Sequence, residues 1–153
     1  MAKTDILAGI SRLYVDSNIF IYLVEGRGAD HDIVGALLKE AAARNIRLMT
    51  SEVTIAECLH GAFKQGNDKL ANVYRDLLSA GIVAETIPGD PVLFEYAAYV
   101  GASLSLKLID AIHVASATIF ECDAFLTNDR GIRAPENLRI IQLQDTAQAG
   151  LLS

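Results

Sequence analysis

A chain of 153 residues and 16.5 kDa fits one domain and is long enough to bury a sizeable core. Hydrophobic residues make up 52% of the chain and charged residues 21%, which is typical of a globular α/β or α protein and excludes extensive disorder. The formal net charge of −6, with a pI near 4.9, disfavours a protein that coats nucleic acid electrostatically.

The first residues and the cysteines favour a cytoplasmic protein without a membrane anchor. Met1 to Ile10 lacks a basic leader before a long apolar run, and no stretch approaches the roughly 18 apolar residues that span a bilayer. Cys58 and Cys122 lie singly in apolar, helix-like segments, with no second cysteine at metal-ligand spacing. We therefore expect two buried free thiols.

The first half of the chain predicts, in order, a strand at 12–16, helices at 18–25 and 30–44, a strand at 46–50, and helices at 52–64 and 67–79. Ser17 and Ser51 offer N-caps for the helices that follow the two strands. Apolar residues recur along one stripe of the 30–44 segment, which supports a helix there.

The second half predicts a strand or extended edge at 82–87, helices at 90–103 and 110–121, and strands at 124–127 and 138–143. Pro91 is well placed in the first turn of its helix. Alternation of apolar strands with helices favours a parallel sheet covered by helices on both faces. Ligands bind outside the carboxyl ends of strands in such sheets, so the chemistry is expected in the residues after each strand.

Four acids occupy positions of this kind beside apolar sequence. Asp16 closes the first strand, and Asp129 follows the 124–127 strand by two residues. Glu57 lies in the helix after the second strand, and Asp110 opens the 110–121 helix. Clustered carboxylates repel one another, and Mg²⁺ makes such a cluster tolerable while it keeps waters that leave room for a phosphate oxygen. One or two such ions can activate a water for phosphodiester hydrolysis.

Each acid also has a purely structural interpretation that the residues alone leave open. Asp110 can cap its helix, and Asp129 can cap the turn before the last strand. Asp16 can form an Asx-turn, and Glu57 can contact Thr54 three residues earlier. Their joint placement at the expected edge of the sheet favours a metal site.

Four segments resemble, in order, the motifs of PIN domains. The segment 15–22 is similar to the opening motif, and 50–57 is similar to the second, in which the helical Glu is the functional acid. The segment 108–117 resembles the third motif, and 126–132 resembles the fourth, a strand followed by Thr-x-Asp. Order and spacing agree over roughly residues 13–143, and the subgroup that the chain resembles is the VapC-like toxins of toxin–antitoxin pairs.

The resemblance implies a three-layer α/β/α sandwich with a central parallel sheet. The PIN-like domain would span 12–145, between an N-terminal extension at 1–11 and a C-terminal tail at 146–153. The resemblance further implies Mg²⁺- or Mn²⁺-dependent cleavage of RNA, often by a homodimer. The partner would be a small antitoxin whose C-terminal segment wraps the domain and inserts a basic side chain into the acidic pocket.

Carried over by position, the resemblance implies a set of metal ligands and catalytic acids, which are Asp16, Glu57, Asp110 and Asp129. Supporting polar positions fall on Asn18, Thr127 and Asn128, and Asn128 would orient Asp129. Arg130 and Lys107 are weaker candidates for contacts with substrate phosphates. Without the four acids the net charge of −6 becomes −2, so the acidic pI agrees with a metal site.

His113 stands three residues after Asp110, which invites a metal-ligand or general-base role. In so apolar a helix, a packed and hydrogen-bonded histidine is the preferred interpretation.

Two other functions were weighed against a metal-dependent nuclease. An aspartate-based phosphotransfer module would use Asp16 as the phospho-acceptor, but dehalogenase-type phosphatases place a second Asp where this chain has Asn18. A receiver would need a Lys after a late strand, and 127–129 has none. A non-catalytic PIN scaffold that binds RNA or protein is the remaining alternative, and the intact acid set argues against it.

Overall fold

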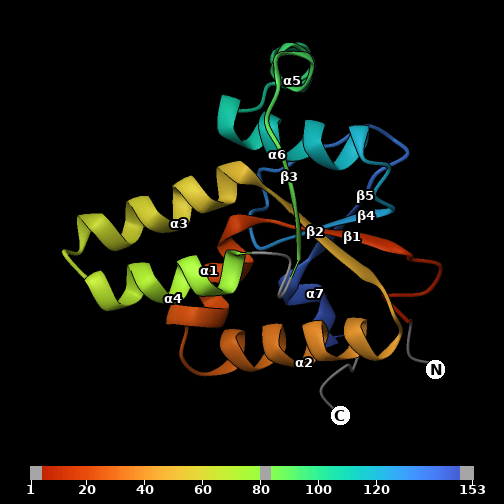
Figure 1. Cartoon of the computed structure of the whole chain (residues 1–153). Helices are drawn as coiled ribbons and strands as arrows, with labels where there is room; N and C mark the ends of the chain where they lie inside the picture. The colour runs from red at the N-terminus through yellow and green to blue at the C-terminus, as the bar shows by residue number, and fades with distance from the viewer. Residues whose placement is uncertain (1–4, 80–83, 149–153) are drawn as a thin grey trace.

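The computed structural model describes residues 5–79 and 84–148, which contain a five-stranded sheet between layers of helices (Figure 1). The strands are β1 (Arg12–Val15), β2 (Arg47–Ser51), β3 (Glu85–Ile87), β4 (Ala124–Thr127) and β5 (Arg139–Gln142). Their order in the sheet is β3-β2-β1-β4-β5, and all four pairings are parallel. Each predicted strand is present, and the part of the predicted 82–87 segment at 82–83 lies outside the described residues.

The helices are α1 (Ser17–Glu25), α2 (Ala29–Ala43), α3 (Glu52–Lys64), α4 (Asp68–Leu78), α5 (Pro91–Leu104), α6 (Leu108–Ile119) and α7 (Leu143–Gln148). In Figure 1, α5 and α6 cover one face of the sheet, while α2 and α7 lie against the other. The predicted three-layer α/β/α sandwich is therefore confirmed. The sequence did not predict α7, which begins directly after β5.

Both faces of the sheet are buried, as its apolar strands require. Successive side chains of a strand point to opposite faces, so Leu13 and Val15 enter the core shared with α1 and α2, whereas Tyr14 enters the other core. That second core joins Tyr14 and Phe125 to residues of α5 and α6, and their rings stack with centroids 5.0 Å apart. Packing on both faces of the sheet thus fixes the position and direction of the strand ends.

Three helix starts near the carboxyl edge differ in how they are capped. Ser51 caps α3 as predicted, because its hydroxyl accepts from the Val53 N–H. Asp16 caps α1, so the prediction that Ser17 would do so is wrong; both residue types make good N-caps, and the helix begins at Ser17 itself. Lys107 occupies the N-cap position of α6, which leaves Asp110 inside the first turn and free of a capping role.

The described part of the predicted N-terminal extension packs onto the domain. Leu7 is buried in the core, and the Asp123 carboxylate accepts from the backbone N–H of Ser11 and of Arg12. The domain limits at 12 and 145 remain a prediction. Cys58 and Cys122 are buried free thiols, as expected.

No single helix in the described ranges is long and apolar enough to cross a membrane. Helices α5 and α6 meet that length and composition only as a pair, bent by 114° at the break between them.

Candidate metal centre

The strand order places a topological switch point between β1 and β4. The chain proceeds from β1 toward β2 and β3 on one side and later adds β4 and β5 on the other, and ligands bind in the crevice where the direction reverses. Val15 pairs with Leu126, and the Asp16 N–H donates to the Leu126 carbonyl at 3.0 Å. Asp16, directly after β1, and Thr127, the last residue of β4, are thereby brought together.

Asp16 is a buried carboxylate held in one orientation by several hydrogen-bond donors. Only 3% of the residue is exposed. Its Oδ1 accepts from the Ser17 N–H at 2.8 Å, and its Oδ2 accepts from the Thr127 hydroxyl at 2.7 Å and the Asn18 amide at 3.2 Å. This network orients the acid before any ligand arrives.

The predicted supporting residues Asn18 and Thr127 tie the loop after β4 to the start of α1. Besides donating to Asp16, the Thr127 hydroxyl accepts from the Asn18 amide at 3.1 Å and from the Asp129 N–H at 3.0 Å. The Asn18 Oδ1 accepts from the Asn128 N–H at 3.1 Å. Both residues therefore occupy the positions at which the sequence placed them.

Asn128 does not orient Asp129 with its side chain, in contrast to the prediction. Its amide donates to the Tyr22 hydroxyl at 2.9 Å. The Asp129 Oδ1 accepts instead from the Gly131 N–H at 2.8 Å, a contact closed within the turn itself. Asp129 therefore does close a turn with its side chain, as one interpretation of the sequence predicted. Its backbone N–H is held separately by the Thr127 hydroxyl.

Glu57 is anchored by a histidine rather than by Thr54, which bonds to Thr50. The His113 Nε2 lies 2.5 Å from the Glu57 Oε1 and 3.5 Å from the Asp16 Oδ1. On its other side, the His113 Nδ1 shares a 2.6 Å hydrogen bond with the Tyr14 hydroxyl. His113 is packed and hydrogen-bonded as expected, but the sequence did not predict that it would join two of the acids.

His113 and Glu57 shift each other's pKa values. Burial opposes a positive charge on His113, but the hydrogen bond to Glu57 and the nearby Asp16 charge outweigh it and raise the pKa of the imidazole. Burial likewise opposes ionisation of Glu57, but the hydrogen bond from His113, the charge of His113 and a contact with Ser17 together outweigh it and hold the pKa of that carboxyl below its usual value. Each partner of the pair thus favours the charged form of the other.

The negative charges of the other acids act on Asp110, and no Lys or Arg of the described residues forms an ion pair with it. Burial raises the pKa of this half-buried carboxyl, and the negative charges of Asp16 and Asp129 raise it further, with a smaller contribution from Glu57. Within residues 5–79 and 84–148, no Lys or Arg forms an ion pair with any of these four acids. The acids that the sequence singled out thus lie near one another, and in the described part of the chain His113 is the basic side chain that contacts two of them.

The donor set fits a hard divalent cation. In the described part of the chain, no three His, Cys, Asp or Glu side chains already converge as a ligand shell. Mg²⁺ does not require one, because it is usually held by one or two carboxylates and completed by waters and substrate phosphates. Carboxylate oxygens that repel one another at a switch point meet that description.

The two cations predicted to contact phosphates differ in availability. The Arg130 guanidinium donates twice to the Gln144 Oε1 and lies 3.5 Å from an Asp145 oxygen, so it is turned toward α7. Lys107 is exposed at the start of α6, three residues before Asp110. Contact of either cation with a substrate phosphate stays a prediction.

The PIN domain family model matches residues 13–138, and the chain belongs to the PIN-domain family. The family membership predicted from the four motifs is confirmed. No curated protein matches the chain.

Several solved structures with the same fold come from toxin–antitoxin systems. A chain of VapBC2 from Rickettsia felis, bound to a promoter DNA fragment, superposes with a TM-score of 0.69 at 17% identity, over 86% of this chain and 98% of that one. A toxin–antitoxin complex from Klebsiella pneumoniae gives 0.65 at 21% identity, over 86% and 97%. VapC20 of Mycobacterium tuberculosis, a sarcin–ricin loop cleaving toxin, gives 0.60 at 16% identity, over 90% and 95%.

Proposed function

We propose that this chain is an endoribonuclease that depends on Mg²⁺ or Mn²⁺ and acts as the toxin of a toxin–antitoxin pair. The observation that carries the proposal is the gathering of four acids from four separate segments at the switch point, where no Lys or Arg of the described residues pairs with them. Membership of the PIN family supports a nuclease. The fold shared with a sarcin–ricin loop cleaving toxin supports RNA as the substrate.

In this function, each residue of the site has a distinct task. Asp16, Glu57, Asp110 and Asp129 would hold the cation, which when bound would polarise the phosphodiester and activate water. Thr127 and Asn18 fix the direction of the Asp16 carboxylate. His113 engages one oxygen of Glu57 and thereby keeps that side chain at the cluster.

Cleavage of a panel of RNAs with Mg²⁺, Mn²⁺ or EDTA tests the proposal. The Asp16→Asn and Asp110→Asn variants keep the size of each side chain and remove its charge, so we expect cleavage to be lost in both, as in EDTA. Asp68→Asn, in the first turn of α4, is the matched control and should cleave like the wild type. Cleavage that persists in EDTA, or in both site variants, would exclude the metal–carboxylate mechanism.

We also propose an antitoxin that places a basic side chain among the acids. Support comes from the fold shared with chains of VapBC2 and of a toxin–antitoxin complex, and from the acid cluster, with which no Lys or Arg of residues 5–79 and 84–148 forms an ion pair. The test is inhibition of cleavage by the product of a short reading frame beside this gene. Inhibition should weaken when the C-terminal basic residues of that product are changed to Gln, and unchanged inhibition would contradict the proposal.

A homodimer is the third element of the proposed function. Val92 and Tyr99 are 71% and 69% exposed, and their seven-residue spacing puts them on one face of α5. Tyr99 also stacks on Tyr96, with ring centroids 6.5 Å apart. Light scattering should give twice the chain mass for the wild type and the single mass for Tyr99→Glu; a wild type that stays monomeric at all concentrations would contradict a dimer.

A further inference from the structure

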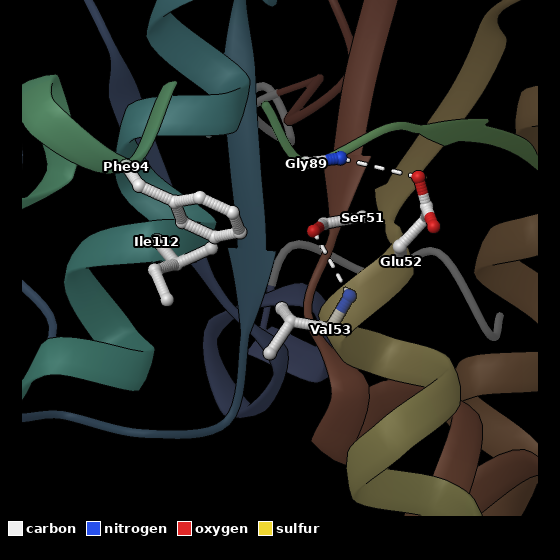
Figure 2. Close-up of a pocket in the computed structure, with 6 residues that line it drawn as sticks. All are labelled: Ser51, Glu52, Val53, Gly89, Phe94 and Ile112. Atoms are coloured by element: carbon white, nitrogen blue, oxygen red, sulfur yellow. Dashed lines mark hydrogen bonds between the residues drawn. The ribbon is translucent and has the colours of Figure 1, made fainter. Parts of the chain in front are cut away.

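A cavity of about 250 Å³ lies beside the acid cluster, and none of the four acids lines it (Figure 2). Its walls come from the start of α3, the loop before α5, α5 itself and α6, and the residues are Ser51, Glu52, Val53, Gly89, Phe94 and Ile112. Pockets for whole small-molecule ligands usually enclose roughly 300–1,000 Å³. This cavity is smaller, and its size suits a single flat ring system.

Most of the wall is apolar, and one side is aromatic. The Phe94 ring is 48% exposed and extends over the space opposite Ser51 and Val53 (Figure 2). Gly89 lets the ring lie against the backbone, because a Cβ at this position would stand 2.7 Å from the Phe94 Cζ. Val53 and Ile112 close the cavity with aliphatic side chains. These are surfaces against which a planar heterocycle packs well.

The Glu52 carboxylate lies at the rim of the cavity and is held there by a backbone hydrogen bond. The Glu52 Oε1 accepts from the Gly89 N–H at 3.1 Å, which fixes the carboxylate at the mouth of the cavity. No ion pair of Glu52 with a Lys or Arg is found in the described ranges. An ionised carboxylate only accepts hydrogen bonds, so it favours a base edge that carries N–H donors. Guanine offers two adjacent donors, whereas uracil offers one between two carbonyls.

Helices α3 and α6 each contribute residues both to the cavity and to the acid cluster. Val53 stands one turn before Glu57 on the same face of α3, and Ile112 directly precedes His113 in α6. Along α3 the cavity wall and the acid cluster are therefore about one helical turn, roughly 5.4 Å, apart. RNA-cleaving and RNA-binding proteins commonly take up splayed bases against aromatic side chains.

We propose that this cavity binds one unstacked base of the RNA substrate and that Glu52 selects a base with N–H donors, guanine above uracil. The inference rests on the proposed function, because it assigns a specificity site to the same nuclease. Phe94 lies two residues after Val92 and so on a different side of α5 from the Val92 and Tyr99 face. A second copy bound to that face leaves the cavity open.

Binding is tested apart from cleavage by following the methyl signals of Val53 and Ile112 in NMR spectra with Mg²⁺ present. Guanosine monophosphate should shift both signals, uridine monophosphate should bind at least about fivefold more weakly, and ribose 5-phosphate should shift neither. The methyls of Ile119, at the far end of α6, serve as the reference. Shifts that depend on protein concentration without nucleotide would instead assign the cavity to a second copy and overturn the proposal.

Cleavage of a randomised RNA pool tests selection. The wild type should prefer sites with guanine beside the cut by about fivefold or more over uracil, and Glu52→Gln should lose this preference because an amide both donates and accepts. Phe94→Leu should raise KM for all sequences, whereas Phe63→Leu, an exposed control on α3, should not. A cleaving wild type whose site preference is unchanged in Glu52→Gln contradicts the cavity proposal alone. A wild type that cleaves no RNA contradicts the proposed function, and the NMR titration then decides the cavity by itself.

Discussion

Acidic side chains lie at both ends of the parallel strands, but their surroundings differ between the amino ends (the amino edge) and the carboxyl ends (the carboxyl edge). At the amino edge several carboxylates have a partner: Glu85 lies 2.7 Å from Arg47, and Asp5 lies 2.8 Å from Arg44. Asp123 accepts from two backbone N–H groups at 2.7 and 2.9 Å. These groups are largely exposed, so water also solvates them. The amino edge is organised as an ordinary protein surface.

At the carboxyl edge the acids are buried or crowded, and no Lys or Arg of the described residues forms an ion pair with the four acids of the cluster. Asp16 is 3% exposed, and the pKa of Asp110 is raised by burial and by its acidic neighbours. Among the described residues, His113 is the one basic side chain that contacts this group. Uncompensated charge costs folding free energy, and perturbed pKa values of this kind cluster at functional sites. The contrast indicates that the carboxyl edge was not arranged for stability.

Removal of one carboxylate from the carboxyl edge should have the largest effect on function. We expect Asp110→Asn to lower RNA cleavage at least about 100-fold, because a metal ion contributes several kcal/mol to catalysis. The same variant should melt at a higher temperature in EDTA. The folded protein raises the pKa of Asp110, so its ionised form opposes folding at neutral pH, and Asn removes that charge.

Asp123→Ala, at the amino edge, is the matched comparison. It should lose about 1–3 kcal/mol of unfolding free energy, since two backbone N–H groups lose a charged acceptor, while cleavage by the folded protein stays at the wild-type rate. Urea unfolding and initial cleavage rates measure both variants. If Asp110→Asn is the destabilised protein and keeps its activity, the two edges have been assigned the wrong roles.

The Tyr14 hydroxyl should act on the metal site through His113 and Glu57. Tyr14→Phe removes the 2.6 Å contact with the His113 Nδ1 and leaves a buried nitrogen without its partner, which should cost about 1–3 kcal/mol of unfolding free energy. Loss of an outer partner typically weakens metal binding about 10–100-fold. Titration of Mn²⁺ followed by electron paramagnetic resonance measures this affinity directly.

Tyr74→Phe separates positioning from stability. Tyr74 is also fully buried, and its hydroxyl donates to Glu25, away from the acid cluster. We expect a comparable loss of stability with unchanged affinity for Mn²⁺. Equal affinities in the two Phe variants would mean that the contact between Tyr14 and His113 only supports the core.

Much of the carboxyl edge could be predicted because its residues lie next to recognisable local patterns. Asp16 and Asp129 follow apolar strands, and the strands form where the sequence predicts them. The contact between His113 and Glu57 could not be predicted, because it depends on how α3 and α6 meet over β1. Its only local signal was the three-residue spacing from Asp110, which puts His113 on the same side of its helix.

Two other features needed the folded chain. The six residues of α7 are too few to display a repeated apolar stripe, so the segment after β5 offered no helical pattern. Arg130 was assigned to phosphates because it follows Asp129, yet its guanidinium reaches Gln144 in α7. Because α7 was not predicted, this contact of Arg130 was not predicted either.

The smallest effect is expected from the ion pair between Arg47 and Glu85 at the amino edge. Both side chains are about half exposed, at 50% and 52%, so water and salt screen their attraction, and exposed pairs contribute about 0.2–1 kcal/mol. A double-mutant cycle with Arg47→Gln and Glu85→Gln, measured by urea unfolding at low and high salt, should give a coupling in that range that salt reduces. Cleavage should be unchanged in all three variants. A coupling above about 2 kcal/mol that resists salt would mean that charge pairing at the amino edge is part of what holds the sheet together, and the difference between the edges would then be one of stability as well as function.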